Sequence, residues 1–310
     1  MKLGYNTHRV RGAMKMAVVK PQSARKHLPL FHKLVPVQRY LSLRNSERTW
    51  PSQAKEQDME ASTREIVPEC SAQEWQARID LAALYRVFVH FGWTDLTYTH
   101  ISARVPGEPE HLLINPYGLL FEEITASNLN KMNLEGKVLS GAHGYNKAGH
   151  LIHSAVLKAR PEIDFVIHSH TRASAAVSAM RCGLLPISQH ANVVRETLAY
   201  HPYAIADEGP EECARLAQDL GEKYLMILHN HGVLACGRTA GEAFLYHYFL
   251  EAACEIQVDV VRSGEEWIAP GEEAVEGLAT WGAPRSKPWG DVQWKALLRM
   301  LERKDPSFKN

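Results

Sequence analysis

From Ser71 onward, apolar residues recur along the chain with two different spacings. Spacings of three and four residues predict amphipathic helices over 71–93, 146–160, 171–183, 211–223 and 239–264. In the first of these, Ser71 and Glu74 have the spacing of a capping box. Short apolar or alternating runs predict strands over 98–106, 111–118, 164–170 and 224–237.

Turn-forming residues add two hairpins to this pattern. "GEPE" joins the strands at 98–106 and 111–118, and a second hairpin is predicted within 122–141. The tail after residue 281 predicts a loop and one short helix. Because strands and helices alternate, the sequence predicts the α/β class, with a sheet covered by helices.

Charge divides the chain into two parts. The 310 residues hold 35 Lys+Arg and 35 Asp+Glu, but residues 1–58 hold 12 basic and 3 acidic residues. We therefore separate a basic N-terminal extension, 1–66, from a domain at 67–310. The extension fits a disordered segment, a mitochondrial transit peptide or a start codon assigned too far upstream.

Composition narrows the location and the partners. The five cysteines are scattered without a CxxC pair, which favours a reducing compartment, and we expect the cytoplasm unless the extension is a transit peptide. No apolar run has the length of a membrane span, so no membrane partner is expected. The zero net charge gives no indication of a nucleic-acid partner.

Two histidine pairs are the strongest candidates for chemistry. His168 and His170 end one apolar run, and His229 and His231 end another, just before Gly232. On a strand, residues two apart point to the same side, so each pair can approach one ion. One such pair alone also fits a chance surface arrangement. Three imidazoles with an open fourth position are typical of a catalytic site for a first-row metal.

Several stretches resemble the class II aldolase/adducin family, from about residue 70 to the end. They include "TYTHISARVPG", "INPYGLLFEEI", "AAVSAMRCGLLPIS" and "AACEIQV", which are similar to the adducin-like branch. The resemblance implies a three-layer α/β/α domain with a central, largely antiparallel sheet. It also implies a divalent metal ion on His168, His170 and His231, with Zn favoured and Mn or Fe as alternatives. His229 falls outside that ligand pattern and is interpreted either as a residue that supports a ligand or as a structural residue.

The sequence departs from the family's sugar-phosphate aldolases at two places. Their catalytic glutamate precedes a helical histidine by four residues; here the histidine is His153 and the glutamate position is Gly149. Glycine cannot exchange protons, so His150 becomes the candidate acid/base residue. His100 stands where those aldolases have an asparagine that binds phosphate, so no phosphorylated substrate is inferred.

The resemblance implies two different functions. The first is a divalent-metal-dependent lyase without the usual glutamate, which cleaves, decarboxylates or dehydrates a small oxygenated substrate through a metal-stabilised enediolate. The second is a non-catalytic, adducin-like oligomerisation module, and only this alternative implies actin or other cytoskeletal partners. In both cases a homo-oligomer is expected, with the tetramer common among relatives.

Overall fold

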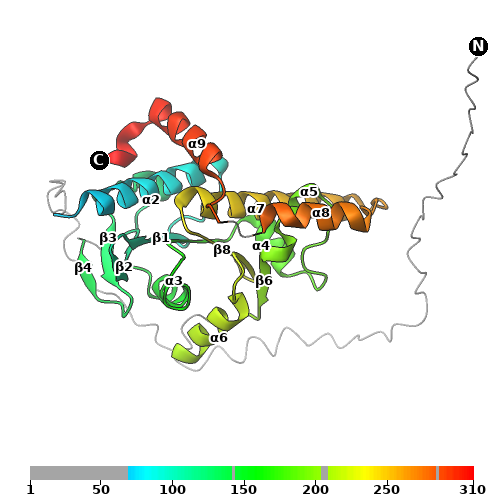
Figure 1. Ribbon diagram of the computed structural model, residues 1–310, viewed down its shortest axis with the longest axis horizontal. Coiled ribbons are helices and arrows are strands. Elements are labelled where there is room, and N and C mark those ends of the chain that lie inside the picture. The colour runs from blue at the N-terminus through cyan, green and yellow to red at the C-terminus, as the bar shows by residue number, and fades with distance from the viewer. Residues whose placement is uncertain (1–68, 142–143, 204–208, 284–285) are drawn as a thin grey trace, which may run out of the picture. The chain divides into compact units, whose positions relative to one another are not determined.

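The computed structural model describes residues 69–141, 144–203, 209–283 and 286–310. The basic extension predicted at 1–66 lies outside these residues. The described part holds an eight-stranded sheet with helices on both faces (Figure 1), so the predicted three-layer α/β/α architecture is confirmed.

The strand order across the sheet is β4-β3-β2-β1-β5-β8-β7-β6. Neighbouring strands are antiparallel except β6 and β7, which run parallel. Both predicted hairpins form, as β1–β2 and β3–β4. The strands are β1 (His100–Val105), β2 (Glu108–Ile114), β3 (Asn130–Asn133), β4 (Val138–Ser140), β5 (Phe165–Ser169), β6 (Leu198–His201), β7 (Leu225–Leu228) and β8 (Gly232–Gly237).

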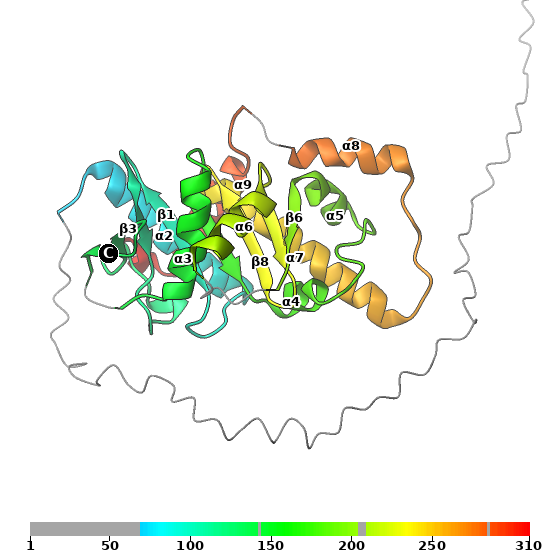
Figure 2. The ribbon, with the colours of Figure 1, turned by 90° about the horizontal axis from the view of Figure 1, so that it is seen from below.

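The helices divide between the two faces of the sheet. Figure 1 shows α2 (Ala72–Phe91) and α7 (Ala240–Ser263) over one face, and Figure 2 shows α3 (Lys147–Ala159) and α6 (Pro210–Leu220) side by side over the other. The remaining α-helices are α4 (Arg172–Ser178), α5 (Gln189–Val194), α8 (Glu272–Gly282) and α9 (Asp291–Lys304). Short 3-10 turns lie at Phe121–Glu123, Arg195–Thr197 and Pro306–Lys309.

The start of α2 follows only half of the predicted capping box. The Ser71 hydroxyl accepts the Glu74 N–H at 3.1 Å, as predicted. The Glu74 carboxylate, however, accepts hydrogen bonds from Arg78 at 2.9 Å and from Lys131 at 2.8 Å. A buried carboxylate needs cationic partners, and this requirement outweighs a bond back to the helix start.

The prediction of one long strand over 224–237 is wrong. The structure divides it into β7 and β8, which form a hairpin with Leu228 opposite Gly232. The chain reverses because Asn230 takes a φ of +55°, a left-handed conformation that asparagine tolerates better than most residues. His229 and His231 therefore lie on a turn, and their spacing of two does not place them on one face of a strand.

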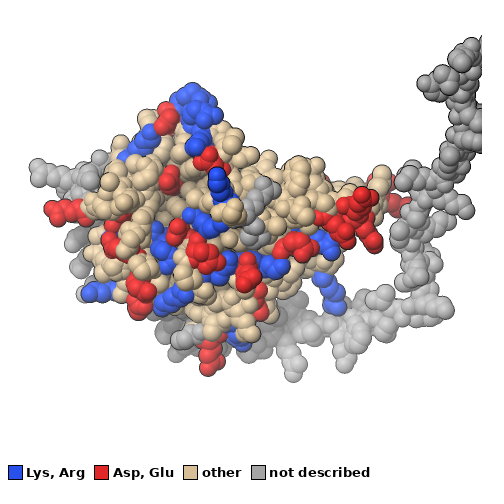
Figure 3. All heavy atoms as spheres, in the orientation of Figure 1, with Lys and Arg blue, Asp and Glu red and all other residues tan. Residues whose placement is uncertain are grey.

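The surface carries charges of both signs. On the face shown in Figure 3, basic and acidic side chains are interspersed, and acidic ones gather where α7 ends and α8 begins. The acidic residues of that segment include Glu265, Glu266, Glu272 and Glu273. Within the described ranges, every helix is too short or too polar to cross a membrane.

His247 is a polar side chain inside the apolar layer between α7 and the sheet. Its ring is fully buried and lies 4.8 Å, centroid to centroid, from both Phe88 and Trp93. Its Nε2 forms a 2.7 Å hydrogen bond with the Ser169 hydroxyl. Burial disfavours the charged imidazolium and lowers the pKa of His247 from 6.5 to about 3.

The His247 pKa predicts a loss of stability in acid. Below pH 6.5 the unfolded chain binds a proton at this residue and the folded chain does not, until about pH 3. The free energy of unfolding should therefore decrease as the pH is lowered from 6.5 toward 3. This group contributes at most about 1.4 kcal/mol per pH unit to the decrease. His247→Gln should show a shallower fall between pH 6.5 and 5, measured by urea denaturation of metal-free protein. Equal slopes for both proteins would contradict the prediction.

Candidate metal centre

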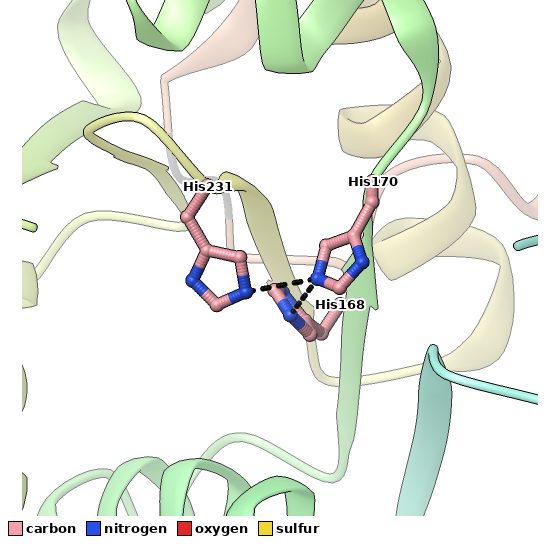
Figure 4. A group of neighbouring side chains, drawn as sticks. All are labelled: His168, His170 and His231. Carbon is pink, nitrogen blue, oxygen red and sulfur yellow. Dashed lines mark hydrogen bonds between the residues drawn. The ribbon is translucent and has the colours of Figure 1, made fainter. Parts of the chain in front are cut away.

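Three histidine side chains meet on the face of the sheet that α3 and α6 cover. His168 is near the end of β5, His170 follows that strand, and His231 ends the turn before β8. The Nε2 atom of His170 lies 2.8 Å from that of His168 and 2.9 Å from that of His231. Figure 4 shows the three rings converging through these atoms. The structure thus brings together all three ligands predicted from the sequence.

The outer nitrogens of two of these rings have acceptors as partners. His168 Nδ1 lies 3.0 Å from the Val233 carbonyl oxygen, and His170 Nδ1 lies 3.0 Å from an Asp95 carboxylate oxygen. In a neutral imidazole, the nitrogen that faces an acceptor carries the proton and the other carries a lone pair. The lone pairs of His168 and His170 are therefore directed toward the centre of the group. Converging lone pairs repel each other unless a cation lies between them, so this donor set suits a divalent metal.

Burial favours the neutral form of His168 and His231. It lowers the pKa of His168 well below its ordinary value, and the neighbouring imidazoles of His100 and His170 lower it further. The pKa of His231 falls to about 4, again through burial first and His170 second. Neutral imidazoles are the form that binds metal ions, so protons do not compete for His168 and His231 near neutral pH.

The pairing of β5 with β8 places the ligands together. Ser169 lies opposite Val233, so the chain enters β8 at Gly232 close to His170. A Cβ atom on Gly232 would lie 2.3 Å from the Ser169 carbonyl oxygen and 3.0 Å from His170 Cδ2. Only glycine allows β8 to begin this close to the histidine strand.

A second histidine group lies beside the first. His100 on β1 is opposite His168 on β5, and their ring centroids are 5.1 Å apart. His100 Nδ1 lies 2.9 Å from His153 Nε2, and His153 Nδ1 lies 2.6 Å from the Ser102 hydroxyl. All three residues are buried. His153 therefore lies between Ser102 and His100 and contacts both.

The His100 ring occupies the space next to Gly149. A Cβ atom on Gly149 would lie 2.2 Å from His100 Nε2. The two departures noted in the sequence, a histidine at 100 and a glycine at 149, thus form one contact. A larger side chain at 149 requires His100 to move.

Two other candidate histidines lie apart from the three ligands. His150 Nε2 lies 2.9 Å from the Asn133 carbonyl oxygen, and its ring packs on Tyr145. This places His150 against the β3–β4 hairpin, and its role as an acid/base residue stays a prediction. His229 Nδ1 lies 3.1 Å from the Ser178 carbonyl oxygen, and its ring stacks on Tyr200.

Asp95 is a site residue that the sequence analysis did not find. It follows α2 in a loop, 75 residues before His170, and its side chain is 41% exposed. A single aspartate in a loop has no spacing that identifies it. Only the folded arrangement shows that it orients a ligand.

Comparison with known proteins identifies the family of this chain. Residues 79–258 match the model of the Class II Aldolase and Adducin N-terminal domain. The chain belongs to this family.

Two curated relatives are similar to this chain over most of the described domain. A Pseudomonas aeruginosa protein named as an aldolase class 2 protein is 44% identical over 250 residues, which cover 79% of this chain and 96% of the relative. Alpha-adducin of Rattus norvegicus is 43% identical over 246 residues, which cover 73% of this chain but only 33% of the adducin.

Two solved structures share the class II aldolase fold. An aldolase II superfamily protein from Pseudomonas syringae is 43% identical, with a TM-score of 0.74, and the match covers 78% of this chain and 98% of that one. L-fuculose 1-phosphate aldolase from Glaciozyma antarctica PI12 is 26% identical, with a TM-score of 0.66, and the match covers 76% and 95%. The predicted fold and family are therefore both confirmed.

The contact between Asp95 and His170 predicts weaker metal binding when the carboxylate is removed. Asp95→Ala should lower the affinity for Zn²⁺ about 10- to 100-fold, because the carboxylate fixes the ring and raises its basicity. Asp95→Asn keeps an acceptor oxygen without the charge and should lie between Asp95→Ala and wild type. Competition with a chromophoric chelator measures the affinity. Asp291→Asn on α9 is the control, and an Asp95→Ala affinity equal to that of the control would contradict the role.

The contact between His100 and Gly149 predicts that alanine destabilises α3. Alanine in a helix interior normally stabilises by up to about 1 kcal/mol relative to glycine, whereas a clash with a buried ring costs about 1–3 kcal/mol. Gly149→Ala should therefore lower the free energy of unfolding. Gly277→Ala on α8, where a Cβ atom would meet nothing within 4 Å, should not lower it. When His100 is replaced by alanine, Gly149→Ala should no longer lower the free energy of unfolding. If it lowers that free energy as much as it does in the wild-type background, the clash is disproved.

Proposed function

We propose that this protein is a divalent-metal-dependent lyase of the class II aldolase type. The observation that carries the proposal is the convergence of His168, His170 and His231 through their Nε2 atoms. Two of these rings are held in the metal-binding tautomer by partners outside the group, Val233 and Asp95. A histidine cluster that served packing alone would have no need for such oriented lone pairs.

The three histidines would hold the ion, and the protein supplies their orientation. A divalent metal in this position provides Lewis acidity toward substrate oxygens. The Val233 carbonyl fixes the ring of His168, and Asp95 fixes the ring of His170. We propose Zn²⁺ as the ion, with Mn²⁺ and Fe²⁺ as alternatives, because imidazole suits all three.

The surroundings of the site favour reactions that develop negative charge on oxygen. Buried His100 and His153 exclude water from the β1 side of the three ligands. In such an environment electrostatic stabilisation is stronger than in bulk water. Aldol cleavage, decarboxylation and dehydration of a small oxygenated compound all develop this charge, and we propose one of them as the reaction.

The similarity to alpha-adducin favours a second candidate, a non-catalytic oligomerisation module. The 43% identity to the adducin is nearly as high as the 44% identity to the aldolase class 2 protein. Sequence similarity therefore does not choose between the two functions. Metal content distinguishes the two functions, because an assembly module has no need for a three-histidine site that holds a metal ion.

Metal analysis tests the proposed function. Protein purified without added metal should contain about one transition-metal ion per chain by elemental mass spectrometry, as expected for a three-histidine site. His168→Ala/His170→Ala should lose the ion, because one remaining imidazole cannot hold it. His90→Ala, an exposed histidine on α2, is the control and should retain it.

An activity assay follows if the wild-type protein holds the metal ion. Loaded wild-type protein would then be assayed for release of carbonyl products or CO₂ from a panel of small hydroxy acids and hydroxy ketones. Wild-type protein that holds no stoichiometric metal, even after reconstitution with Zn²⁺, Mn²⁺ or Fe²⁺, would overturn the lyase proposal. That outcome would favour the oligomerisation module.

A further inference from the structure

A pocket adjoins the three ligand histidines on the side of α6. Ile152 of α3, Cys213 and Leu216 of α6, Leu228 of β7 and the turn residues His229 and His231 line it. Its cavity volume is about 30 Å³, and the empty space that also counts open solvent is about 420 Å³. Figure 2 shows α3 and α6 side by side on this face of the sheet.

The pocket and the candidate metal centre share one residue. His231 directs its Nε2 atom toward His170 and also forms part of the pocket wall. The pocket therefore begins at one of the three histidines, His231. This adjacency makes the pocket a candidate for substrate selection.

The lining of the pocket is mostly apolar. Ile152, Leu216 and Leu228 present aliphatic side chains, and all three are buried in the absence of a ligand. An apolar substituent that enters such a pocket gains free energy in proportion to the area it removes from water. A polar substituent would lose its hydration without equivalent partners.

The polar groups at the far end of the pocket are bound to one another. His201 Nε2 lies 2.6 Å from a Glu212 carboxylate oxygen, and His201 Nδ1 lies 2.8 Å from an Asp219 carboxylate oxygen. Both ring nitrogens of His201 therefore face carboxylates. Glu212 also forms an ion pair with Arg215. Because these polar groups already have partners, a phosphate or carboxylate group in the pocket would lose its hydration without equivalent compensation.

We propose that this pocket receives a short alkyl substituent of the substrate, whose oxygens face His168, His170 and His231. The substrate class is then a small hydroxy-carbonyl compound with an uncharged apolar end. Cys213 and Leu216 are its specificity-determining residues, because they form the wall opposite the sheet. This inference rests on the proposed metal site.

Alkyl hydroxamates of increasing length test the inference, because the hydroxamate group chelates a metal and the chain probes the pocket. Metal-loaded full-length protein is titrated calorimetrically with acetohydroxamate, propionohydroxamate, butyrohydroxamate and hexanohydroxamate. Each methylene that enters the pocket should lower the Kd by up to about fourfold, which corresponds to about 0.8 kcal/mol. Succinic monohydroxamate, with a carboxylate at the chain end, should bind more weakly than butyrohydroxamate.

Variants on α6 locate the effect. Cys213→Phe fills the pocket and should abolish the dependence on chain length while acetohydroxamate still binds. Ala214→Phe adds the same ring on the exposed side of α6 and should behave as wild type. Leu216→Ala enlarges the pocket, so the hydroxamate that binds most tightly should have a longer alkyl chain than in wild type. With this second variant, the test does not depend on the folding of Cys213→Phe alone.

The outcomes separate this inference from the proposed function. Protein without metal, shown by elemental analysis, would overturn the proposed function itself. Protein that holds metal and binds acetohydroxamate, but shows no dependence on chain length, would overturn the pocket alone. An unchanged dependence in Cys213→Phe, or tighter binding of the succinic probe, would also overturn it.

Discussion

The site depends on one constraint, the close antiparallel pairing of β5 with β8 at Gly232. The Ser169 carbonyl occupies the position that a Cβ atom on Gly232 would need. Because side chains alternate along a strand, a shift of one residue in this pairing would turn His168 into the opposite layer. The same register places the Val233 carbonyl against His168 Nδ1. One backbone contact therefore sets both the position of a ligand and its tautomer.

The second orienting group comes from a different part of the chain. Asp95 follows α2, which packs on the far face of the sheet from α3, and reaches His170 around the end of β5. The packing of α2 and α7 on that face includes His247, whose Nε2 binds Ser169 between the two ligand histidines. The apolar layer on one face and the histidine cluster on the other are thus linked through the same strand end. Changes in the core are expected to reach the site by this route.

Periodicity in the sequence predicts most of this fold, and the exceptions have local causes. The helices and the two hairpins follow from apolar spacing and turn residues, and His168-x-His170 is readable because a strand has a period of two. The continuous apolar run over 224–237 conceals a turn, which depends on the left-handed backbone of Asn230. The contact of His100 with Gly149 and that of Asp95 with His170 join residues far apart in the chain. No spacing rule predicts them, because the packing of α3 on the sheet creates the first and the loop after α2 creates the second.

The glycine at position 149, where the sugar-phosphate aldolases have a glutamate, also limits the chemistry that the site can perform. Within the described residues, the carboxylate in contact with the three ligands is that of Asp95, and it lies behind His170 rather than among the Nε2 atoms. Where a glutamate would stand, the His100 ring fills the space, held by His153 and Ser102. The surroundings of the metal position are therefore imidazole groups and the apolar pocket beside His231. At the proposed metal site, such surroundings would leave a substrate oxygen as the anionic partner of the ion, in keeping with the proposed reactions that develop negative charge on the substrate.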